Sequence, residues 1–582
     1  VQRDVICDES KLGIPKVDKS EPDTLMLDLS PHDGLGLPGE LRRSSRDTHR
    51  PIRFGIDEFC NNVEHHAPTD SVFSEPSSFA DAMSRPEANH WVQAANEEYK
   101  SLIDMNTWDL VPLPPGRQPV SCKWVFKLKC NSDGSVDRYK ARLVARGFTQ
   151  QQGVDFDETY APVVHRTSLR ALLSYDSSQN MIIHQMDVVT AFLNGELAEH
   201  IYMTQPEGFV TPGSENLVCK LKRSLYGLKQ SPRCWNLVLD QYLKSLGFSQ
   251  SSADQCVYIR NDGGQQTLLA VYVDDIVILS DSEKSMHDIK SSLSQKFKMK
   301  DLGPIHYVLG ISVAVNDESL KMYQPNYIYQ TLRKYKMYDC NPVHTPMTMD
   351  VKLCTDDGSQ PADKSLYQSL IGSLLYLSTA TRPDIAYAVG VLSRFTAAPT
   401  ETHLTAAKRV LRYLKFTPEL GISYYRSGSK PVGYSDSSWA DDDTRHSTSG
   451  VVFMYAGGPV LWLSKRQSVV ALSTTEAEYV AAFDATREAA WLRQLYLDIT
   501  GCECTPITLY IDNTSAICIA NNSATTKRSK HMDVRYHYVR EEVNSLHIKT
   551  VHCPTVEMIA DILTKPVPRP RYDELRSKLG VA

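Results

Sequence analysis

The stretch LLAVYVDDIVILS, residues 268–280, places two adjacent aspartates, Asp274 and Asp275, in the middle of an apolar run. Ionised carboxylates are costly to bury, and two neighbouring like charges raise that cost further. Apolar arms on both sides of a polar pair are typical of a β-hairpin. The pattern therefore predicts a hairpin whose tip carries both aspartates out of the core into a cleft, where a divalent cation neutralises them.

A third carboxylate follows a second apolar strand. The segment IIHQMDVVTAFLNG, residues 182–195, brings Asp187 to the end of a predicted strand and then reaches an Asn-Gly turn. A motif as short as aromatic-x-Asp-Asp is frequent by chance, so it indicates a site only when a third carboxylate accompanies it. Three carboxylates at strand ends can hold two Mg²⁺ ions, the arrangement that activates a 3′-hydroxyl and stabilises a pyrophosphate leaving group.

Length and composition limit the classes of protein to consider. A chain of 582 residues exceeds the size of a single hydrophobic core, so several domains are expected. No apolar run reaches the 18 residues or so that a membrane span needs, so no membrane partner is predicted. The 13 cysteines contain no C-x-x-C pair, which favours a reduced, intracellular protein without a zinc module. The first residue is Val rather than Met, which suggests a fragment or a processed product.

The net charge of −6 is unevenly distributed along the chain. Residues 1–80 hold 15 Asp and Glu against 9 Lys and Arg, so the remainder is close to neutral. Two stretches are locally basic, RYKARLVARG (138–147) and CKLKRSLYGLKQSPRCW (219–235), and the second interleaves aromatic residues. Such stretches are compatible with nucleic-acid binding, and a solvated charged face is the alternative.

The chain divides into four regions by pattern. Residues 1–85 are acidic, rich in Ser and Pro, and predict a flexible tail or linker. Helical and β-rich segments mix from 86 to 349 without a βαβ rhythm. Residues 350–427 are mainly helical, and a second β-rich region covers 428–582. The expected fold class is therefore a multidomain mixture of α+β and α/β.

A second set of acidic residues occurs in the last region. Three apolar strands, KPVGYSD and the two arms of SGVVFMYAGGPVLWLS, precede a helix that opens with Ser473-x-x-Glu476, a capping box. A further strand, PITLYID, and a predicted helix, VEMIADILTK, follow. The acidic residues at the ends of these elements are Asp436, Glu478, Asp512 and Asp561. A helix-capping role for Asp512 and a surface position for Glu478 are the alternatives.

These motifs resemble a known family. QMDVVTAFLNG, SLYGLKQSPRCW and YVDD, in that order, resemble the reverse transcriptase of copia-type LTR retrotransposons. The likeness extends through KARLVARGFTQQQGVDFDETYAPVV, DLGPIHYVLGI and ADILTKP, from about Trp91 to the end. The last region resembles ribonuclease H. The resemblance implies a right-hand polymerase with fingers and palm in 86–349, a helical thumb or connection in 350–427, and a ribonuclease H-like domain in 428–582.

The resemblance also implies roles for individual residues. It implies two Mg²⁺ ions per active site, with Mn²⁺ as a substitute, held by Asp187, Asp274, Asp275, Asp436, Glu478, Asp512 and Asp561. Nucleotide-binding residues would be Lys140, Arg142, Phe192 and Gln230, with the Phe192 ring excluding a ribose 2′-hydroxyl unless it is a simple core residue. Because Arg and Lys match phosphate oxygens and aromatic rings stack on bases, the nucleic-acid contacts would be Lys229, Arg233, Tyr226, Trp235, Lys527 and Arg528.

The expected function is RNA-directed DNA synthesis combined with ribonuclease H activity, which copies retrotransposon RNA into DNA. The partners would be an RNA template, a DNA or tRNA primer, dNTPs, the RNA–DNA hybrid, and other polyprotein parts such as integrase and capsid. Cytoplasmic particles or the nucleus are the expected locations. A catalytically inactive nucleic-acid-binding remnant is the alternative, as is a ribonuclease H whose polymerase part only positions the hybrid. Ser438 and Val189 depart from the family's usual Asp and Lys without removing a ligand.

Overall fold

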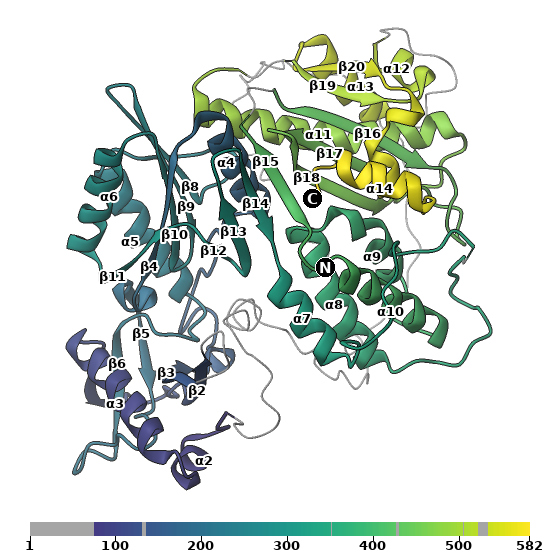
Figure 1. Ribbon diagram of the computed structural model, residues 1–582. Coiled ribbons are helices and arrows are strands. Elements are labelled where there is room, and N and C mark those ends of the chain that lie inside the picture. The colour runs from purple at the N-terminus through teal and green to yellow at the C-terminus, as the bar shows by residue number, and fades with distance from the viewer. Residues whose placement is uncertain (1–74, 131–135, 351, 427–429, 504–505, 522–532) are drawn as a thin grey trace, which may run out of the picture. The chain divides into compact units, whose positions relative to one another are not determined.

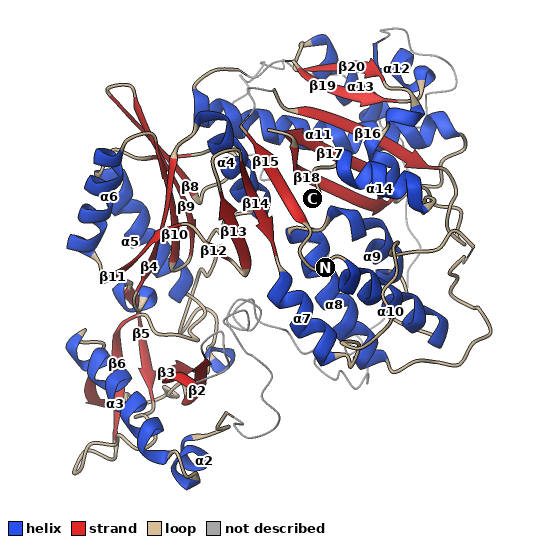
Figure 2. Cartoon of the chain, viewed as in Figure 1, coloured by secondary structure: helices blue, strands red, loops and turns tan. Residues whose placement is uncertain are grey.

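The computed structural model describes residues 75–582, apart from 131–135, 351, 427–429, 504–505 and 522–532 (Figure 1). Within these residues the strands form five sheets, which the helices connect and cover (Figure 2). None of the helices in the same residues combines the length and the apolarity that crossing a bilayer requires.

Order begins earlier than the sequence suggested. Helix α2 (Phe79–Ser84) is capped by the Ser78 side chain and lies inside the segment expected to be flexible. Glu75 accepts a hydrogen bond from Lys127 Nζ at 2.8 Å, which ties the start of the described chain to a strand. The prediction of a flexible tail is therefore wrong for residues 75–85, and residues 1–74 lie outside the described part.

The first described region contains two small sheets. Trp91 of α3 packs edge-to-face against Phe126, which anchors this helix on the β2–β3 hairpin. Apolar side chains from both sheets and from α3 share one core. The elements are α3 (Ala88–Asp104), the hairpin β2 (Cys122–Cys130) and β3 (Val136–Ala145), the three-stranded sheet β1 (Trp108–Pro112), β6 (Leu217–Arg223) and β5 (Glu196–Met203), and η2 (Gly147–Thr149).

A six-stranded sheet forms the centre of residues 86–349, the polymerase-like region. Strand β10 pairs antiparallel with both β9 and β4, so the predicted hairpin is confirmed and the strand carrying Asp187 lies beside it. Ile276 and Ile278 face the core under α5 and α6, whereas Val277 and Leu279 face the core that includes α4. The strand order is β11 (Met299–Pro304), β4 (Ile182–Val188), β10 (Asp275–Ser280), β9 (Gln265–Tyr272), β8 (Val257–Asp262) and β7 (Ser249–Gln250), and the helices are α4 (Arg166–Gln179), η3 (Ala191–Asn194), α5 (Ser231–Ser245) and α6 (Glu283–Lys296).

The middle region is helical, as predicted, but also contributes a strand. Strand β15 (Gly421–Tyr425) pairs with β14 (Ser319–Tyr323), about a hundred residues earlier, and extends a four-stranded sheet. This long-range pairing had no local signal. The helices of residues 350–427 are α8 (Lys364–Ala380), η4 (Pro383–Ile385), α9 (Ala386–Ser393) and α10 (Glu401–Phe416). The sheet also contains β12 (Tyr307–Val308) and β13 (Ile311–Val315), which precede this region, as does α7 (Pro325–Lys334).

The C-terminal sheet has the predicted order of three strands, a helix and a strand. β16 pairs antiparallel with β17 and parallel with β19, and α11 crosses between β18 and β19 with Ser473 as its cap. The strand order is β18 (Gly458–Arg466), β17 (Thr448–Tyr455), β16 (Val432–Ser438), β19 (Ile507–Ile511) and β20 (Ile548–His552). The helices are α11 (Thr474–Thr500), α12 (Thr514–Asn521), α13 (Asp533–Asn544), η5 (Thr555–Glu557), η6 (Ile559–Leu563) and α14 (Arg569–Lys578).

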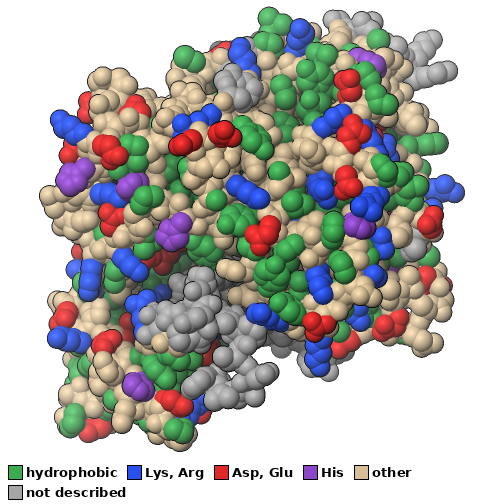
Figure 3. Space-filling model, viewed as in Figure 1, with side chains coloured by type: hydrophobic (Ala, Val, Ile, Leu, Met, Phe, Trp, Pro, Cys, Tyr) green, Lys and Arg blue, Asp and Glu red, His purple; other side chains and the backbone are tan. Residues whose placement is uncertain are grey.

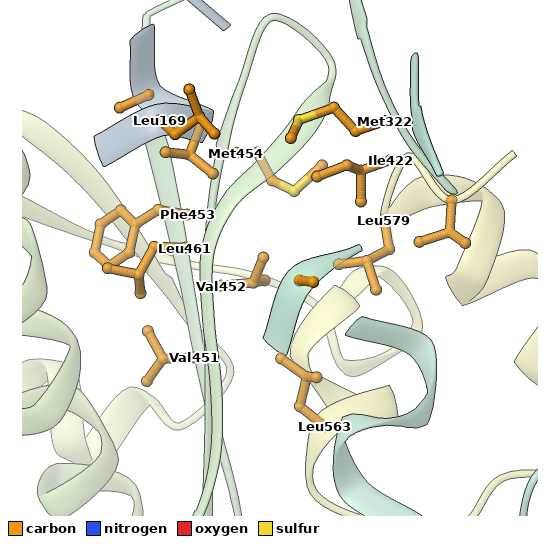
Figure 4. Packing of buried hydrophobic residues seen from close by; sticks show 14 of the residues in the cluster. Leu169, Met322, Ile422, Val451, Val452, Phe453, Met454, Leu461, Leu563 and Leu579 are labelled. Carbon is orange, nitrogen blue, oxygen red and sulfur yellow. The ribbon is translucent and has the colours of Figure 1, made fainter. Parts of the chain in front are cut away.

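A continuous core joins the polymerase-like region to the C-terminal sheet. Figure 4 shows Leu169 of α4 and Met322 of β14 near side chains of β15, β17 and β18. Arg170 of α4 is buried, donates to the carbonyls of Val460 (2.7 Å) and Thr379 (2.9 Å), and lies 4.0 Å from the Trp462 ring centroid. The domain boundaries at 349 and 427 remain predictions, because side chains from both sides of each boundary share this core.

A buried carboxyl in α4 predicts a pH-dependent stability. Within the described residues Asp176 Oδ1 has no hydrogen-bond partner, and burial raises the pKa of Asp176 to about 7 although the Met181 amide and Arg426 oppose the shift. The unfolded pKa is near 4, so between about pH 4 and 7 the folded state keeps a proton that the unfolded state has released. This stabilisation is complete at low pH and is lost as the pH rises to 7.

We therefore expect Asp176→Asn to raise the free energy of unfolding by a few kcal/mol at pH 8 and by clearly less at pH 5. Urea denaturation at the two pH values is the measurement. The exposed Asp262→Asn serves as the control and should change neither value. Equal effects of Asp176→Asn at both pH values would contradict the raised pKa.

Candidate functional site

Two aspartates lie at the tip of the β9–β10 hairpin. Val273 and Asp274 form the turn, and Asp275 is the first residue of β10, opposite Tyr272. Val273 has a φ of +55°, a left-handed conformation that a β-branched residue rarely adopts. The carbonyl of Asp274 accepts a hydrogen bond from the Val188 amide at 2.9 Å, which fixes the tip against β4.

The third aspartate faces this tip across the sheet. Asp187 on β4 is paired in register with Asp275 on β10. Burial raises the pKa of Asp275 to about 7, and the charges of Asp274 and Asp187 add to that shift. Burial and then Asp274 raise the pKa of Asp187, whereas Lys140 and Lys300 lower it. Three mutually repelling carboxyls at one end of these two interior strands form a site that a cation would stabilise.

Two basic residues predicted to bind the nucleotide lie on β3, within electrostatic reach of Asp187. Burial, with the neighbouring cations Arg142 and Arg138, lowers the pKa of Lys140 to about 8, while Glu98 and Asp187 oppose this shift. Glu98, on α3, accepts a hydrogen bond from the Leu143 amide. The guanidinium of Arg142 lies 4.9 Å from the centroid of the Tyr226 ring.

Tyr226 contacts two of the predicted nucleotide-binding residues, Arg142 and Phe192. Its ring makes an edge-to-face contact with Phe192 at 4.8 Å between centroids. Burial raises the pKa of Tyr226 to about 12, with Arg142 acting in the opposite direction and Asp274 and Asp187 acting in the same direction. Arg142, Tyr226, Phe192 and the aspartates therefore lie together. Phe192 is buried on the same side of the sheet as α5.

Gln230, predicted to bind the nucleotide, is held by protein hydrogen bonds, and its role at the nucleotide stays a prediction. Its side chain is 1% exposed, donates to the carbonyl of Asp155 at 2.9 Å and accepts from Gln150 Nε2 at 3.0 Å. Its amide is thus used in holding the loop that contains Gln150 and Asp155. Tyr226, four residues earlier, is the side chain of this segment that lies between Arg142 and Phe192, a place that the sequence did not indicate.

The structure corrects the prediction for Trp235. The side chain is 2% exposed, stacks edge-to-face on Phe297, and donates its indole N–H to the carbonyl of Val273. No ring face is open to a base, so the prediction that a template base stacks on Trp235 is wrong. The sequence already indicated that Trp235 is buried, because one helix face carries apolar residues four apart, at Trp235, Leu239 and Leu243.

The remaining predicted nucleic-acid contacts have protein partners here or lie outside the described residues. Lys229 donates to the carbonyl of Gln150, and Arg233 forms an ion pair with Glu158 at 2.7 Å. Lys527 and Arg528 lie outside the described residues. Figure 3 shows one face of the molecule, on which Lys and Arg side chains are interspersed with Asp and Glu. These contacts stay predictions.

One cleft has mixed charge, and Asp187, Asp274 and Asp275 are not among its lining residues. It has a volume of about 1220 Å³ and lies between α3 and α5. Val189 and Thr190, directly after the strand that holds Asp187, line it. Its lining includes both acidic and basic side chains, among them Glu97, Lys100, Asp157, Glu199, Arg223 and Lys298.

The second acidic group lies at one end of the C-terminal sheet. Asp436 is near the end of β16, Glu478 is in the first turns of α11, and Asp512 directly follows β19. Each offers an oxygen within 4.8 Å of the others, and among the described residues this is the one group of three or more potential metal ligands that meets this limit. The carboxylates of Asp187, Asp274 and Asp275 are therefore spread more widely.

Burial and mutual repulsion define the electrostatics of this group. Burial raises the pKa of Glu478, and the nearby Asp436 and Asp512 raise it further. Glu478 Oε1 accepts hydrogen bonds from the Ser437 amide (3.1 Å) and hydroxyl (3.0 Å), whereas Oε2 is buried without a partner in the described part of the chain. An unpaired buried oxygen among three carboxylates fits a cation site.

Asp561 differs from the other three residues. It lies in a 3₁₀ turn, η6, instead of the predicted helix. Its carboxylate pairs with Lys565 at 2.5 Å and approaches Arg571 at 3.7 Å. Asp561 interacts electrostatically with Asp436, whose pKa burial raises, but it is not within the compact group. Three of the four predicted carboxylates form the compact group, and Asp561 lies outside it, paired with the lysine four residues later; its role as a metal ligand stays a prediction.

Comparison with known proteins places the chain in a family. Residues 105–349 match the model of "Reverse transcriptase (RNA-dependent DNA polymerase)". The chain is 42% identical to the Retrovirus-related Pol polyprotein from transposon TNT 1-94 of Nicotiana tabacum over 93% of this chain and 41% of that protein. It is 36% identical to a transposon Ty5-1 protein of Saccharomyces cerevisiae over 52% of this chain and all of that protein.

Among solved structures, a crystal structure of prototype foamy virus protease–reverse transcriptase is similar at 15% identity over 81% of this chain and 53% of that chain. Its TM-score of 0.22 is too low to carry an argument. The chain spans about two fifths or less of the length of the plant Pol polyproteins that it matches. On the sequence matches, the chain belongs to the copia-type retrotransposon Pol polyproteins and includes their reverse transcriptase domain.

Proposed function

We propose that this chain is an RNA-directed DNA polymerase that also cleaves the RNA strand of an RNA–DNA hybrid. The observation that carries the proposal is the pairing of Asp187 with Asp275 beside Asp274, within electrostatic reach of Lys140 and Arg142. Carboxylates next to basic side chains suit a reaction in which a triphosphate must be held while a hydroxyl attacks it. The family match supports the same activity.

The residues at both sites fit divalent cations. At the first site, burial and repulsion between the carboxyls raise the pKa of Asp187 and Asp275, although Lys140 and Lys300 oppose the shift at Asp187. At the second, Glu478 Oε2 is an orphaned buried oxygen between two other carboxylates. Asp187, Asp274 and Asp275 would hold ions at the first site, and Asp436, Glu478 and Asp512 at the second. Bound Mg²⁺, or Mn²⁺ in its place, would supply Lewis-acid stabilisation of the charge that develops on phosphate oxygens.

The chain's own side chains would bind and orient the nucleotide. Lys140 and Arg142 would contact the triphosphate, because guanidinium and ammonium groups donate to phosphate oxygens. Arg142 is held against the Tyr226 ring, and Tyr226 is held against Phe192, so the three form a wall of fixed geometry. This wall would support the sugar and phosphates of a bound dNTP.

The topology of the C-terminal sheet supports the second activity. Its three carboxylates come from β16, from α11 and from the residue after β19, three elements that meet at one end of the sheet. Thr564 Oγ1 donates to Asp436, and Thr555 Oγ1 donates to Asp512 at 3.1 Å. These bonds orient two of the carboxylates toward the group. Asp561 would act through Lys565 and the field it exerts on Asp436.

The expected partners are an RNA template, a DNA or tRNA primer, dNTPs and the hybrid, together with other parts of the polyprotein such as integrase and capsid. We expect an intracellular location, in cytoplasmic particles or in the nucleus. None of these partners needs a membrane.

The test uses one preparation and two substrates. Purified protein with Mg²⁺ is expected to extend a DNA primer on an RNA template and to cut the RNA of a preformed hybrid. Hybrid binding with neither reaction would indicate a catalytically inactive remnant. Cleavage without extension would indicate a ribonuclease H whose polymerase part only positions the hybrid.

Phe192 gives a prediction about sugar selection. We expect Phe192→Ala to raise the ratio of rNTP to dNTP incorporation by about tenfold or more, because the ring that would meet a 2′-hydroxyl is removed. Single-nucleotide extension with each substrate is the measurement. Phe297→Ala removes a ring from the same core and is the control. An unchanged ratio in Phe192→Ala would make Phe192 a packing residue alone.

A further inference from the structure

Trp235 donates a hydrogen bond to the hairpin that carries Asp274, and the proposed function assigns no role to this bond. It lies on α5, beneath the six-stranded sheet, with its ring edge-to-face against Phe297 at 5.1 Å. Its indole N–H donates to the carbonyl of Val273 at 2.6 Å. The acceptor belongs to the residue directly before Asp274, at the tip of the hairpin.

The acceptor is also the strained residue of that tip. A β-branched side chain at a φ of +55° is disfavoured, so Val273 keeps this conformation only if its surroundings hold it there. Two consecutive carbonyls of the tip are held by hydrogen bonds from different elements. The Val188 amide of β4 donates to Asp274 O at 2.9 Å, and Trp235 of α5 donates to Val273 O.

The orientation of the Val273–Asp274 peptide decides where the Asp274 side chain points. Relief of the φ strain requires rotation about the N–Cα bond of Val273, which would swing this peptide, move the Val273 carbonyl and turn the Asp274 carboxylate away from Asp187. Such a rotation would break the bond to Trp235 and leave a buried indole N–H without its acceptor, which opposes it. Trp235 is 2% exposed and cannot turn to water for a replacement.

We propose that Trp235 is a positioning residue for polymerisation: its indole N–H locks the strained Val273 peptide and so presents Asp274 to the site. The polymerase readout rests on the proposed function. Trp235 is not a nucleic-acid contact. It acts from inside the protein on the geometry of the carboxylate group.

The chain offers a matched control. Trp491 of α11 also donates its indole N–H to a backbone carbonyl, that of Ala253 at 3.0 Å, and neither residue belongs to or directly precedes a carboxylate of the two groups. Trp235→Phe and Trp491→Phe therefore remove the same type of hydrogen bond and keep an aromatic ring. A general effect of losing an indole hydrogen bond appears in both variants, whereas a positioning effect appears in Trp235→Phe alone.

In primer extension we expect Trp235→Phe to lower kcat about tenfold while the KM for dNTP changes less than about twofold. Hybrid cleavage at the C-terminal site should stay within about twofold of wild type, and so should both activities of Trp491→Phe. Extension by Trp235→Phe at the rate of wild type, or reduced no more than in Trp491→Phe, overturns the proposal.

Two further variants address folding and strain. If Trp235→Phe does not fold, replacement of Trp235 by 3-benzothienylalanine keeps the bicyclic shape, removes the N–H alone and should give the same tenfold loss. Val273→Gly removes the penalty for positive φ. In the Val273→Gly background, Trp235→Phe should therefore lower kcat for primer extension clearly less than tenfold. Equal costs in the two backgrounds contradict the locking of a strained peptide.

A binding measurement separates this proposal from the proposed function. Mn²⁺ binding is measured by electron paramagnetic resonance in protein carrying Asp436→Asn and Asp512→Asn, which removes the C-terminal group. Trp235→Phe should weaken the remaining Mn²⁺ affinity severalfold, and Trp491→Phe should not. If wild type extends no primer, the proposed function fails, but the Mn²⁺ affinity still tests the role of Trp235. An Mn²⁺ affinity that Trp235→Phe leaves unchanged overturns the positioning role of Trp235.

Discussion

Asp274→Asn is expected to reduce primer extension on an RNA template by about 10³-fold or more, with primer–template binding largely intact. The carbonyl of Asp274 is fixed by Val188, and its carboxylate interacts with Asp187, whose pKa it raises. An amide keeps the shape of the side chain but cannot neutralise a cation or share one with Asp187 and Asp275. The substitution therefore removes charge without disturbing the hairpin.

The control for this substitution is Asp262→Asn, an exposed aspartate of strand β8 in the same sheet. Extension is measured in single turnover with saturating dNTP, and binding is measured by fluorescence anisotropy of the primer–template. Extension by Asp274→Asn within about tenfold of wild type would remove Asp274 from the mechanism. Loss of binding together with extension would place Asp274 in duplex recognition instead.

Glu478→Gln is expected to reduce hybrid cleavage by about 10³-fold or more and, at the same time, to stabilise the protein. Burial and the charges of Asp436 and Asp512 raise the pKa of Glu478, so its ionised form is unfavourable in the folded state. Because the folded pKa lies above the unfolded value, stability is lost as the pH rises through the range between them. Glutamine carries no charge, so the free energy of unfolding at pH 8 should rise by on the order of 1 kcal/mol.

Glu476→Gln, two residues earlier in the same helix, is the matched control. Glu476 accepts a hydrogen bond from the Leu472 amide near the start of α11 and lies outside the carboxylate group. Its substitution should leave cleavage near the wild-type rate and lower stability slightly, because a cap is weakened. A Glu478→Gln protein that cleaves normally, or that is less stable at pH 8 without added metal, would contradict the electrostatics described for this site.

The parts of these sites that the sequence revealed are those with a local pattern. The apolar arms around Asp274 and Asp275 require a hairpin, and the apolar strand before Asp187 brings a third carboxylate to the same sheet. In the C-terminal region, strands that end in Asp436 and Asp512 and a capped helix that begins before Glu478 are equally local signals. Alternating burial makes such patterns readable without a structure.

The parts that the sequence did not reveal depend on contacts between distant residues. The side-chain amide of Gln230 accepts a hydrogen bond from Gln150, eighty residues earlier, and no local sequence pattern predicts such a partner. Strand β15 pairs with β14, which lies about a hundred residues earlier in the sequence. This pairing helps to join the polymerase-like and C-terminal regions through one core. Trp235 is a different case, because its helical spacing indicated burial although its basic and aromatic neighbours suggested nucleic acid.

The most direct test of two separate carboxylate sites in one chain is a single reaction on a doubly labelled substrate. A DNA primer and its RNA template carry different fluorophores, so extension and RNA cleavage are read together for wild type, Asp274→Asn and Glu478→Gln. We predict that wild type does both, that Asp274→Asn cleaves without extending, and that Glu478→Gln extends without cleaving. Loss of both reactions in either variant, in protein that keeps its circular dichroism spectrum, would contradict the two-site account.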